Sequence, residues 1–241
     1  MNYLVTISYD GSNFHGWAKQ NSVRTIQSEV EKILQKIFNQ SITIHGSGRT
    51  DAYVHAIAQT FSFIVKKSKI QPYALLKTLR NLSPDDIYFI NVKVNEGMFH
   101  ARFNAKNKTY QYVINNDKYD LFKNHYELFY PHKLNLPLLK KGAKLLIGTH
   151  DFKSFSTSDL NDTVRTINYI KFKKNKKHLF ITINGDGFLR NMVRMIVGSL
   201  LDLNEHKKTI KDIQLLLNHP KKGSAITKIK ASGLYLLKVN Y

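Results

Sequence analysis

The sequence has no cysteine, and acidic residues are scarce, with 17 Asp and Glu against 37 Lys and Arg. The missing cysteines exclude disulfides, thiolate zinc sites, iron–sulfur clusters and cysteine nucleophiles. No apolar run reaches the roughly 18 residues that span a bilayer, and the best stretch, Met192 to Leu201, contains Arg194. No basic segment followed by an apolar one stands at the N-terminus, as a secretion signal requires. These absences predict a cytoplasmic protein with no membrane partner.

The formal net charge is +20, and such a surplus attracts polyanions, of which nucleic acid is the commonest in a cell. Hydrophobic residues make up 42% and aromatic residues 12%, which is enough to build a folded core. Compositional drift is the alternative explanation of the charge, because 30 of the 37 basic residues are Lys and only 7 are Arg. The arginines are more informative, since their planar fork suits phosphates and carboxylates.

Hydrophobic periodicity predicts the order β-α-β-β-α-β in the first half of the chain. Thr25 can cap the first helix, and Pro72 suits the first turn of the second. The expected elements are the strand Tyr3–Tyr9 with Tyr3, Val5, Ile7 and Tyr9 on one face, a helix with apolar residues Ile26, Val30, Ile33, Leu34, Ile37 and Phe38, the strands Ser41–His45 and Ile57–Val65, a helix carrying Tyr73, Leu76, Leu79 and Leu82, and the strand Ile87–Val94.

The second half predicts the same order with one extra helix. Its expected elements are the strands Thr109–Ile114, Val164–Phe172, Leu179–Ile183 and Leu234–Val239 and the helices Leu136–Ile147, Phe188–Leu203 and Thr209–Leu217. This pattern predicts an α+β fold of two ferredoxin-like or RRM-like units, residues 1–100 and 101–241, with antiparallel sheets flanking a central basic cleft. RNA-recognition modules use the sheet face that their helices leave free.

The densest group of reactive side chains follows Gly46 and Gly48, in a segment that joins two expected strands. Arg49, Asp51 and His55 are close together there, and connecting segments hold a large share of catalytic residues. An Asp near Gly more often caps backbone amides in a surface turn. In a chain short of acids, however, a carboxylate between an Arg and a His should stay ionised, which suits a nucleophile or a base.

The segment Gly48-Arg49-Thr50-Asp51-Ala52-Tyr53-Val54-His55-Ala56 resembles the active-site motif of the TruA family of tRNA pseudouridine synthases. Other segments resemble the family in the same order along essentially the full chain. They are Tyr9-Asp10-Gly11-Ser12, Gly16-Trp17, Thr25-Ile26-Gln27, Phe99-His100-Ala101-Arg102, Thr109-Tyr110-Gln111-Tyr112, His150-Asp151-Phe152, Phe188-Leu189, Met192-Val193-Arg194, Ile196-Val197-Gly198 and Gly233-Leu234-Tyr235-Leu236. Three positions depart from the family's pattern, where Tyr53 replaces a Gly, Ala18 a Gln and Lys230 a Pro.

The resemblance implies an isomerase that converts uridine to pseudouridine at positions 38, 39 and 40 in the anticodon stem-loop of tRNA, and that acts as a homodimer. It implies that Asp51 is the catalytic carboxylate, as nucleophile or base, on a flipped-out uridine. Tyr110 would stack on the target uracil, and Arg194 would pair with Asp51 and keep it ionised. Arg49 is the other candidate partner of Asp51, although the family uses that position more to hold the flipped nucleotide and its phosphate. Phosphate contacts are expected from Arg24, Arg102 and Arg165.

Two other functions fit parts of the sequence. A non-catalytic RNA-binding protein of two RRM-like units fits the charge and the repeat equally well, but it gains nothing from a carboxylate that faces phosphates. A His-dependent ribonuclease would need two His placed as acid and base, which the sequence neither shows nor excludes. The ten His show no metal-ligand spacing, and no Gly-rich loop precedes a Lys-Ser or Lys-Thr pair, so we expect no metal and no cofactor.

The charge predicts that tRNA binding weakens steeply with salt, because Lys and Arg contacts release counterions from phosphates. Titrations with tRNA at several salt concentrations give the slope of log affinity against log salt. A flat dependence would contradict the prediction and would favour compositional drift as the origin of the charge.

Overall fold

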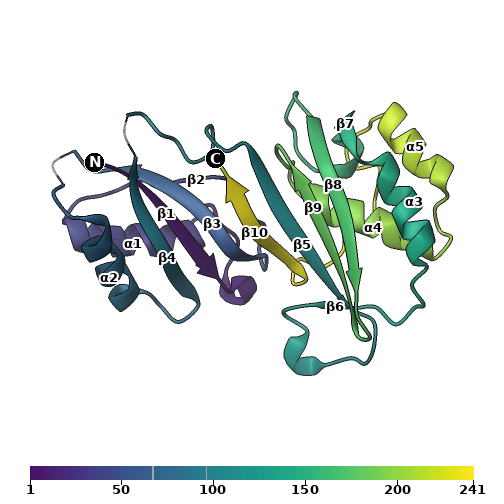
Figure 1. The fold of residues 1–241 in the computed structure, drawn as a ribbon, viewed down its shortest axis with the longest axis horizontal. Helices are drawn as coiled ribbons and strands as arrows, with labels where there is room; N and C mark the ends of the chain where they lie inside the picture. Colours follow the sequence, from purple (N-terminus) through teal and green to yellow (C-terminus); the bar gives the residue numbers. More distant parts are fainter. Residues whose placement is uncertain (67, 96) are drawn as a thin grey trace. The chain divides into compact units, whose positions relative to one another are not determined.

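The computed structural model describes residues 1–66, 68–95 and 97–241, and the chain divides into two compact units (Figure 1). The first unit is Met1–Lys106 with Tyr235–Tyr241, and the second is Asn107–Leu234. The sequence predicts a single boundary after residue 100. In the structure the chain passes between the units twice, after Lys106 and after Leu234. The last strand belongs with the first unit, where it pairs with the strand His55–Ile64.

The first unit contains a mixed sheet with two helices against one face (Figure 1). Its strands lie in the order β4-β1-β3-β10, and β2 also pairs with β3. The pairs β1–β3, β1–β4 and β2–β3 are antiparallel, but β10 runs parallel to β3. The expected strand Ser41–His45 is reduced to a two-residue β2. The elements are β1 (Asn2–Tyr9), η1 (Gly11–Asn13), α1 (Ile26–Phe38), β2 (His45–Gly46), β3 (His55–Ile64), α2 (Pro72–Leu82), β4 (Ile87–Asn95) and β10 (Leu234–Asn240).

Burial in β1 and the start of α1 follow the sequence pattern. The alternate β1 residues Tyr3, Val5, Ile7 and Tyr9 are buried. Helix α1 begins at a capping box, in which the side chains of Thr25 and Ser28 accept from each other's backbone N–H. The predicted cap and the predicted inward face are therefore confirmed.

Helix α2 buries a different face from the expected one. Leu75 and Leu79 are fully buried, whereas Tyr73 is 78% exposed. The apolar residues of this short helix fit two overlapping stripes, and periodicity does not choose between them. Packing against β4 and α1 selects the stripe that contains Leu75.

Tyr241 anchors the segment after β10 within the first unit. Its hydroxyl lies 2.6 Å from Thr60 Oγ1 and donates to the carbonyl of Ala101 at 2.9 Å. Burial raises the pKa of Tyr241 to about 12, so the hydroxyl keeps its proton and remains a donor. One side chain thus joins β3 to the segment that precedes Lys106.

The second unit contains a sheet in the order β5-β9-β8-β7, in which all these neighbours are antiparallel. The short β6 pairs in parallel with β5. Helices α3, α4 and α5 lie on one face of this sheet (Figure 1). The elements are β5 (Asn107–Asn115), η2 (Leu121–Lys123), β6 (Leu128–Phe129), α3 (Leu136–Leu145), β7 (Gly148–Asp151), η3 (Lys153–Phe155), β8 (Val164–Lys174), β9 (His178–Gly185), α4 (Met192–Asn204) and α5 (Ile210–Asn218).

Helix α4 forms the core of the second unit, since its residues other than Arg194 are buried. It begins at Met192 and not at Phe188 as predicted. Asn191 prevents an earlier start, because its left-handed conformation, with φ of 65°, does not fit a right-handed helix. Gly198 allows close packing, because a Cβ there would lie 2.2 Å from the carbonyl oxygen of Thr227.

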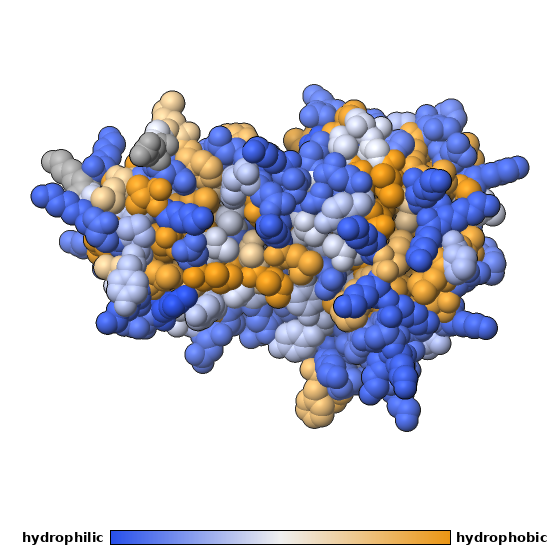
Figure 2. Space-filling model, viewed as in Figure 1, coloured by the Kyte–Doolittle hydropathy of each residue, from blue (hydrophilic) through white to orange (hydrophobic). Residues whose placement is uncertain are grey.

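Hydrophilic residues cover much of the surface in the view of Figure 2, with apolar patches between them. Exposed apolar side chains on the strands of the first unit include Ile57, Ile64, Tyr88 and Val94. Across the described parts of the chain, no helix has the length and apolar character needed to cross a bilayer.

Candidate active site

Asp51 is half-buried in the loop of residues 47–54, which connects β2 to β3. The fully buried Gln59 of β3 holds the start of this loop. Its amide donates to the carbonyl of Gly48 at 3.0 Å, and its oxygen accepts from Ser47 Oγ at 2.5 Å. The buried hydroxyl of Tyr9 fixes the residue before Asp51, since it lies 2.8 Å from Oγ1 of that threonine. The sheet thus positions one side of the loop.

The segment before α1 holds the other side of the loop. The Trp17 N–H donates to the carbonyl of Thr50 at 3.1 Å, and the Tyr53 N–H donates to the carbonyl of Phe14 at 3.2 Å. The first bond fixes the peptide group that precedes Asp51, and the second fixes the peptide group after Ala52. The backbone that carries the carboxylate is therefore ordered before any substrate arrives.

His55 is 2% exposed and serves as a fixed acceptor. Its Nδ1 accepts from the Gly11 N–H at 3.0 Å, and its ring stacks on Tyr235 with centroids 4.7 Å apart. Asp10 Oδ1 lies 3.2 Å from the same nitrogen. Burial, the bond from Gly11 and the stack on Tyr235 give His55 a structural role in holding the start of β3.

Two exposed side chains, Arg49 and Tyr53, flank Asp51 in the loop. Within the described residues Arg49 makes no hydrogen bond or ion pair, so its guanidinium can meet a ligand. The Val54 N–H donates to the carbonyl of Asp51 at 3.3 Å and closes a turn, in which Tyr53 is the third residue, with φ of 67°. A cation and an aromatic ring thus stand within two residues of the carboxylate.

Arg194 is half-buried on α4 of the second unit, where two oxygens orient its guanidinium. Nε donates to the carbonyl of Ile229 at 2.9 Å, and Nη1 donates to Asn191 Oδ1 at 3.0 Å. Asn191 is itself fixed by donating to Thr157 Oγ1 at 2.7 Å. The positive charge therefore has a defined direction. Its pairing with Asp51 stays a prediction.

Tyr110 of β5 is 7% exposed, and its ring meets Phe188 nearly edge-on, with centroids 5.1 Å apart and planes at 81°. Tyr112 lies on the same face of the strand but is fully buried, and its hydroxyl donates to the carbonyl of Lys230 at 2.7 Å. Tyr112 is thus a core residue of the second unit. The stacking role of Tyr110 stays a prediction.

The three arginines expected to contact phosphate have different surroundings. Arg24 bonds both carboxylate oxygens of Asp86, at 2.5 and 2.9 Å, and this hydrogen bonding raises the pKa of Arg24. Arg165 donates to Asp162 Oδ1 at 3.3 Å. Arg102 is exposed, unlike the other two. Of the three, Arg102 is the most accessible to an RNA phosphate.

An open hollow of about 450 Å³ adjoins Arg24, and three carboxylates line it, from Asp10, Asp85 and Asp86. Negative charge there disfavours a phosphate ligand. Residues 1–66, 68–95 and 97–241 contain no group of three or more His, Asp or Glu that could hold a metal ion.

Two buried polar side chains that belong to no motif in the sequence support the candidate site residues. Gln59 fixes the Asp51 loop through Gly48 and Ser47. Asn184 of β9 donates to Asn107 Oδ1 and to Thr109 Oγ1, both at 2.9 Å, directly beside Tyr110. Buried polar groups are nearly always hydrogen-bonded, so a Gln or Asn at an inward-facing strand position is the signal that could have found them.

The chain matches known proteins along its whole length. Residues 5–104 and 143–241 match the family described as tRNA pseudouridine synthase. The tRNA pseudouridine synthase A of Ureaplasma parvum is 48% identical over 242 residues, and that of Malacoplasma penetrans is 47% identical over 243, with 100% of both chains covered each time. The enzyme of Clostridium acetobutylicum is 38% identical over 243 residues, covering 100% of this chain and 99% of its own.

The solved structure of the archaeal box H/ACA sRNP Nop10-Cbf5 complex is a weak match. It has a TM-score of 0.35 at 11% identity and covers 97% of this chain and 46% of that chain. A structural likeness at this level supports no conclusion about function. The sequence matches, in contrast, define an RNA-modifying isomerase. The chain belongs to the tRNA pseudouridine synthase family, whose reaction converts uridine to pseudouridine in tRNA. The protein is therefore an enzyme and not a purely RNA-binding module.

We expect His55→Ala to lower the free energy of unfolding by about 2–5 kcal/mol, because it deletes a buried ring and leaves the buried Gly11 N–H without its acceptor. His55→Asn is the matched control and should cost less, since its side-chain oxygen can replace Nδ1 as acceptor. Urea unfolding of both variants measures the difference. Equal stability of His55→Ala and the unchanged protein would contradict the anchoring role.

Proposed function

We propose that this protein forms pseudouridine at positions 38, 39 and 40 of the anticodon stem-loop of tRNA, with Asp51 as the catalytic carboxylate. The observation that supports Asp51 is its placement in a loop held from both sides, by Gln59 and by the segment that contains Trp17. A reacting group fixed in this way needs little ordering at the moment of reaction. The tRNA positions come from the resemblance to the TruA family.

The reaction breaks the bond between ribose C1′ and uracil N1 and forms a bond between C1′ and C5 of the same base. A proton leaves C5 and a proton is gained at N1, so the change is an isomerisation that needs no oxidant or reductant. Asp51 can act in two ways. It can attack C1′ as a nucleophile and form a covalent ester, or it can remove a proton as a base. Both roles require the ionised carboxylate.

Tyr110 is proposed to stack on the target uracil. The uridine must leave the helical stack before a protein carboxylate can reach C1′, and stacking on an aromatic ring offsets part of that cost, about 1–3 kcal/mol per base. The contact with Phe188 supports this role, because it fixes the plane of the Tyr110 ring. Asn184 supports it as well, since its bond to Thr109 fixes the neighbouring residue of the strand.

Arg194 and Arg49 are proposed to support the reaction. A guanidinium beside Asp51 would keep the carboxylate ionised, and Arg194 suits this because its direction is already set by two oxygens. Arg49 suits the phosphate of the flipped nucleotide, since it is exposed in the same loop. Arg102 fits a further phosphate contact better than Arg24 and Arg165, which are bonded to carboxylates.

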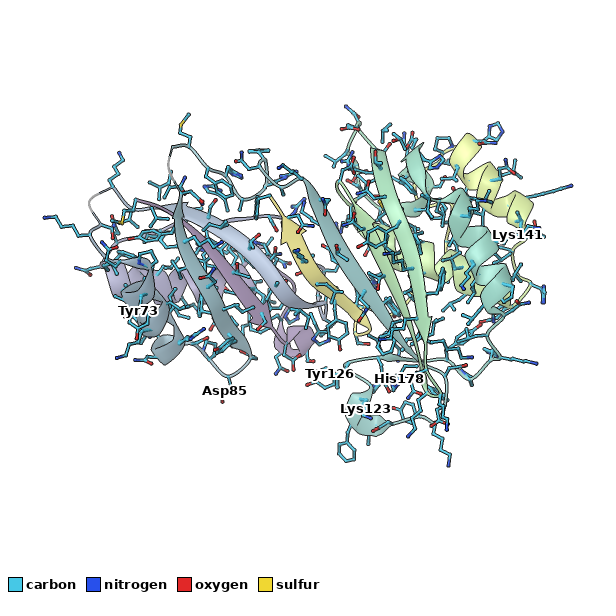
Figure 3. All side chains as sticks on the ribbon, viewed as in Figure 1. Tyr73, Asp85, Lys123, Tyr126, Lys141 and His178 are labelled. Atoms are coloured by element: carbon cyan, nitrogen blue, oxygen red, sulfur yellow. The ribbon has the colours of Figure 1, made fainter. Side chains whose placement is uncertain are left out.

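Asp51→Asn is expected to abolish pseudouridine formation and to retain tRNA binding, because an amide keeps the shape of the side chain but cannot attack C1′ or accept a proton. Pseudouridine mapping after incubation with full-length tRNA measures the amount and the position of product together. Asp85→Asn, the same substitution at an exposed turn residue (Figure 3), should keep full activity.

More than a few per cent of activity in Asp51→Asn would contradict the catalytic role. Product found only in another arm of the tRNA would contradict the anticodon assignment and would leave the role of Asp51 standing.

We also propose a cytoplasmic homodimer. A folded tRNA extends well beyond one pocket, so a second chain, also with a charge of +20, would add basic surface that grips the body of the tRNA. Gripping by shape needs no readout of each base, which suits an enzyme that acts at several adjacent positions. The ferredoxin-like character of the units and the basic cleft stay predictions.

Sedimentation of the free protein at micromolar concentration is expected to give twice the chain mass of 27.9 kDa. An isolated anticodon stem-loop should be modified less efficiently than full tRNA, because it lacks the body that the second subunit would hold. A monomer at that concentration would overturn the dimer.

A further inference from the structure

Tyr53 has a backbone conformation that a tyrosine rarely adopts. It is the third residue of the turn closed by the Val54 N–H and the Asp51 carbonyl, with φ of 67°. Glycine is usual at such a position, because it adopts a positive φ without steric cost. A bulky residue there is strained, and strain of this kind concentrates at functional sites. Tyr53 thus places an aromatic side chain at a position that glycine would occupy without strain.

The ring of Tyr53 is accessible, and its backbone is fixed. The residue is 47% exposed, and its hydroxyl makes no hydrogen bond within the described residues. Its N–H is bound to the carbonyl of Phe14. The exposed ring of His15 lies beside it, with centroids 6.3 Å apart and planes at 50°, and the His15 N–H is bound to the carbonyl of Arg24 at 2.9 Å. Two exposed rings thus stand together on a rigid backbone.

We propose that Tyr53 and His15 form a stacking subsite for an unpaired RNA base, next in sequence to the nucleotide that reacts at Asp51. This inference rests on the proposed catalytic role of Asp51. Tyr53 follows Asp51 by two residues, which span at most about 7 Å, so a base on the Tyr53 ring is a neighbour of the target. Arg49, exposed two residues before Asp51, gives the phosphate between the two nucleotides a cation.

A nucleobase suits these rings for a physical reason. When the target uridine leaves its helix, the adjoining base loses one of its stacking neighbours, and the Tyr53 ring can replace that neighbour. Every base has a π-face, so such a platform tolerates different sequences. This tolerance matches an enzyme that is proposed to act at several positions in one loop.

The test compares full-length proteins that differ at Tyr53. Tyr53→Gly removes the ring and relieves the strained backbone, so its melting temperature should stay equal or rise. We expect tRNA affinity to fall about five- to 150-fold, the effect of losing one stack between a base and an aromatic ring. KM should rise accordingly, with a smaller change in kcat. Tyr53→Phe keeps the ring and should stay within about twofold of the unchanged protein.

Tyr73→Ala is the control for loss of an exposed tyrosine, since Tyr73 projects from α2 (Figure 3) and should not affect tRNA affinity. Photocrosslinking identifies the base, because 5-iodouridine placed next to the target should crosslink to Tyr53. Unchanged affinity and KM in Tyr53→Gly, an equal loss in Tyr53→Phe, or a crosslink only from a distant nucleotide would overturn the subsite.

Failure of the proposed function gives a separate result. In that case the unchanged protein forms no pseudouridine in the anticodon stem-loop, whatever Tyr53→Gly does to tRNA affinity.

Discussion

The backbone hydrogen bonds between the segment before α1 and the loop 47–54 are the constraint on which the site depends. Trp17 holds the peptide group before Asp51, Phe14 holds the one after Ala52, and the buried Gln59 holds the start of the loop. Loops carry much of the chemistry of proteins, but a mobile loop must be ordered each time a substrate binds. Here folding has already ordered it, and the strain at Tyr53 is one cost of that arrangement.

Several of the scarce carboxylates have a defined partner. Asp86 pairs with Arg24, Asp202 pairs with Lys208, and Glu127 lies 2.8 Å from the ring of His178. Most of the 37 basic residues are left over, so the field around the protein stays positive and draws in a polyanion. The loop that holds Asp51 also carries the exposed Arg49.

Features that depend on near neighbours can be predicted from the sequence, and features that depend on distant contacts cannot. The cap at Thr25 and the inward face of β1 belong to the first kind. The buried stripe of α2 depends on its packing partners, and the parallel pairing of β10 joins residues far apart in the chain. The Asp51 loop can be located from the sequence because its motif is a run of neighbouring residues. The bond from Gly11 to His55 spans 44 positions and leaves no local signal.

The return of β10 to the first unit affects the order in which the protein can fold as it is made. The sheet of that unit is complete only once Tyr235–Tyr241 has been translated, after all of residues 107–234. At 5–20 residues per second, that interval lasts roughly 6–26 s. Until then the end of β3 next to the Asp51 loop lacks its parallel partner, and His55 lacks the ring of Tyr235. The nascent chain therefore carries the Asp51 loop beside an unpaired strand edge, which can pair with another chain until β10 arrives.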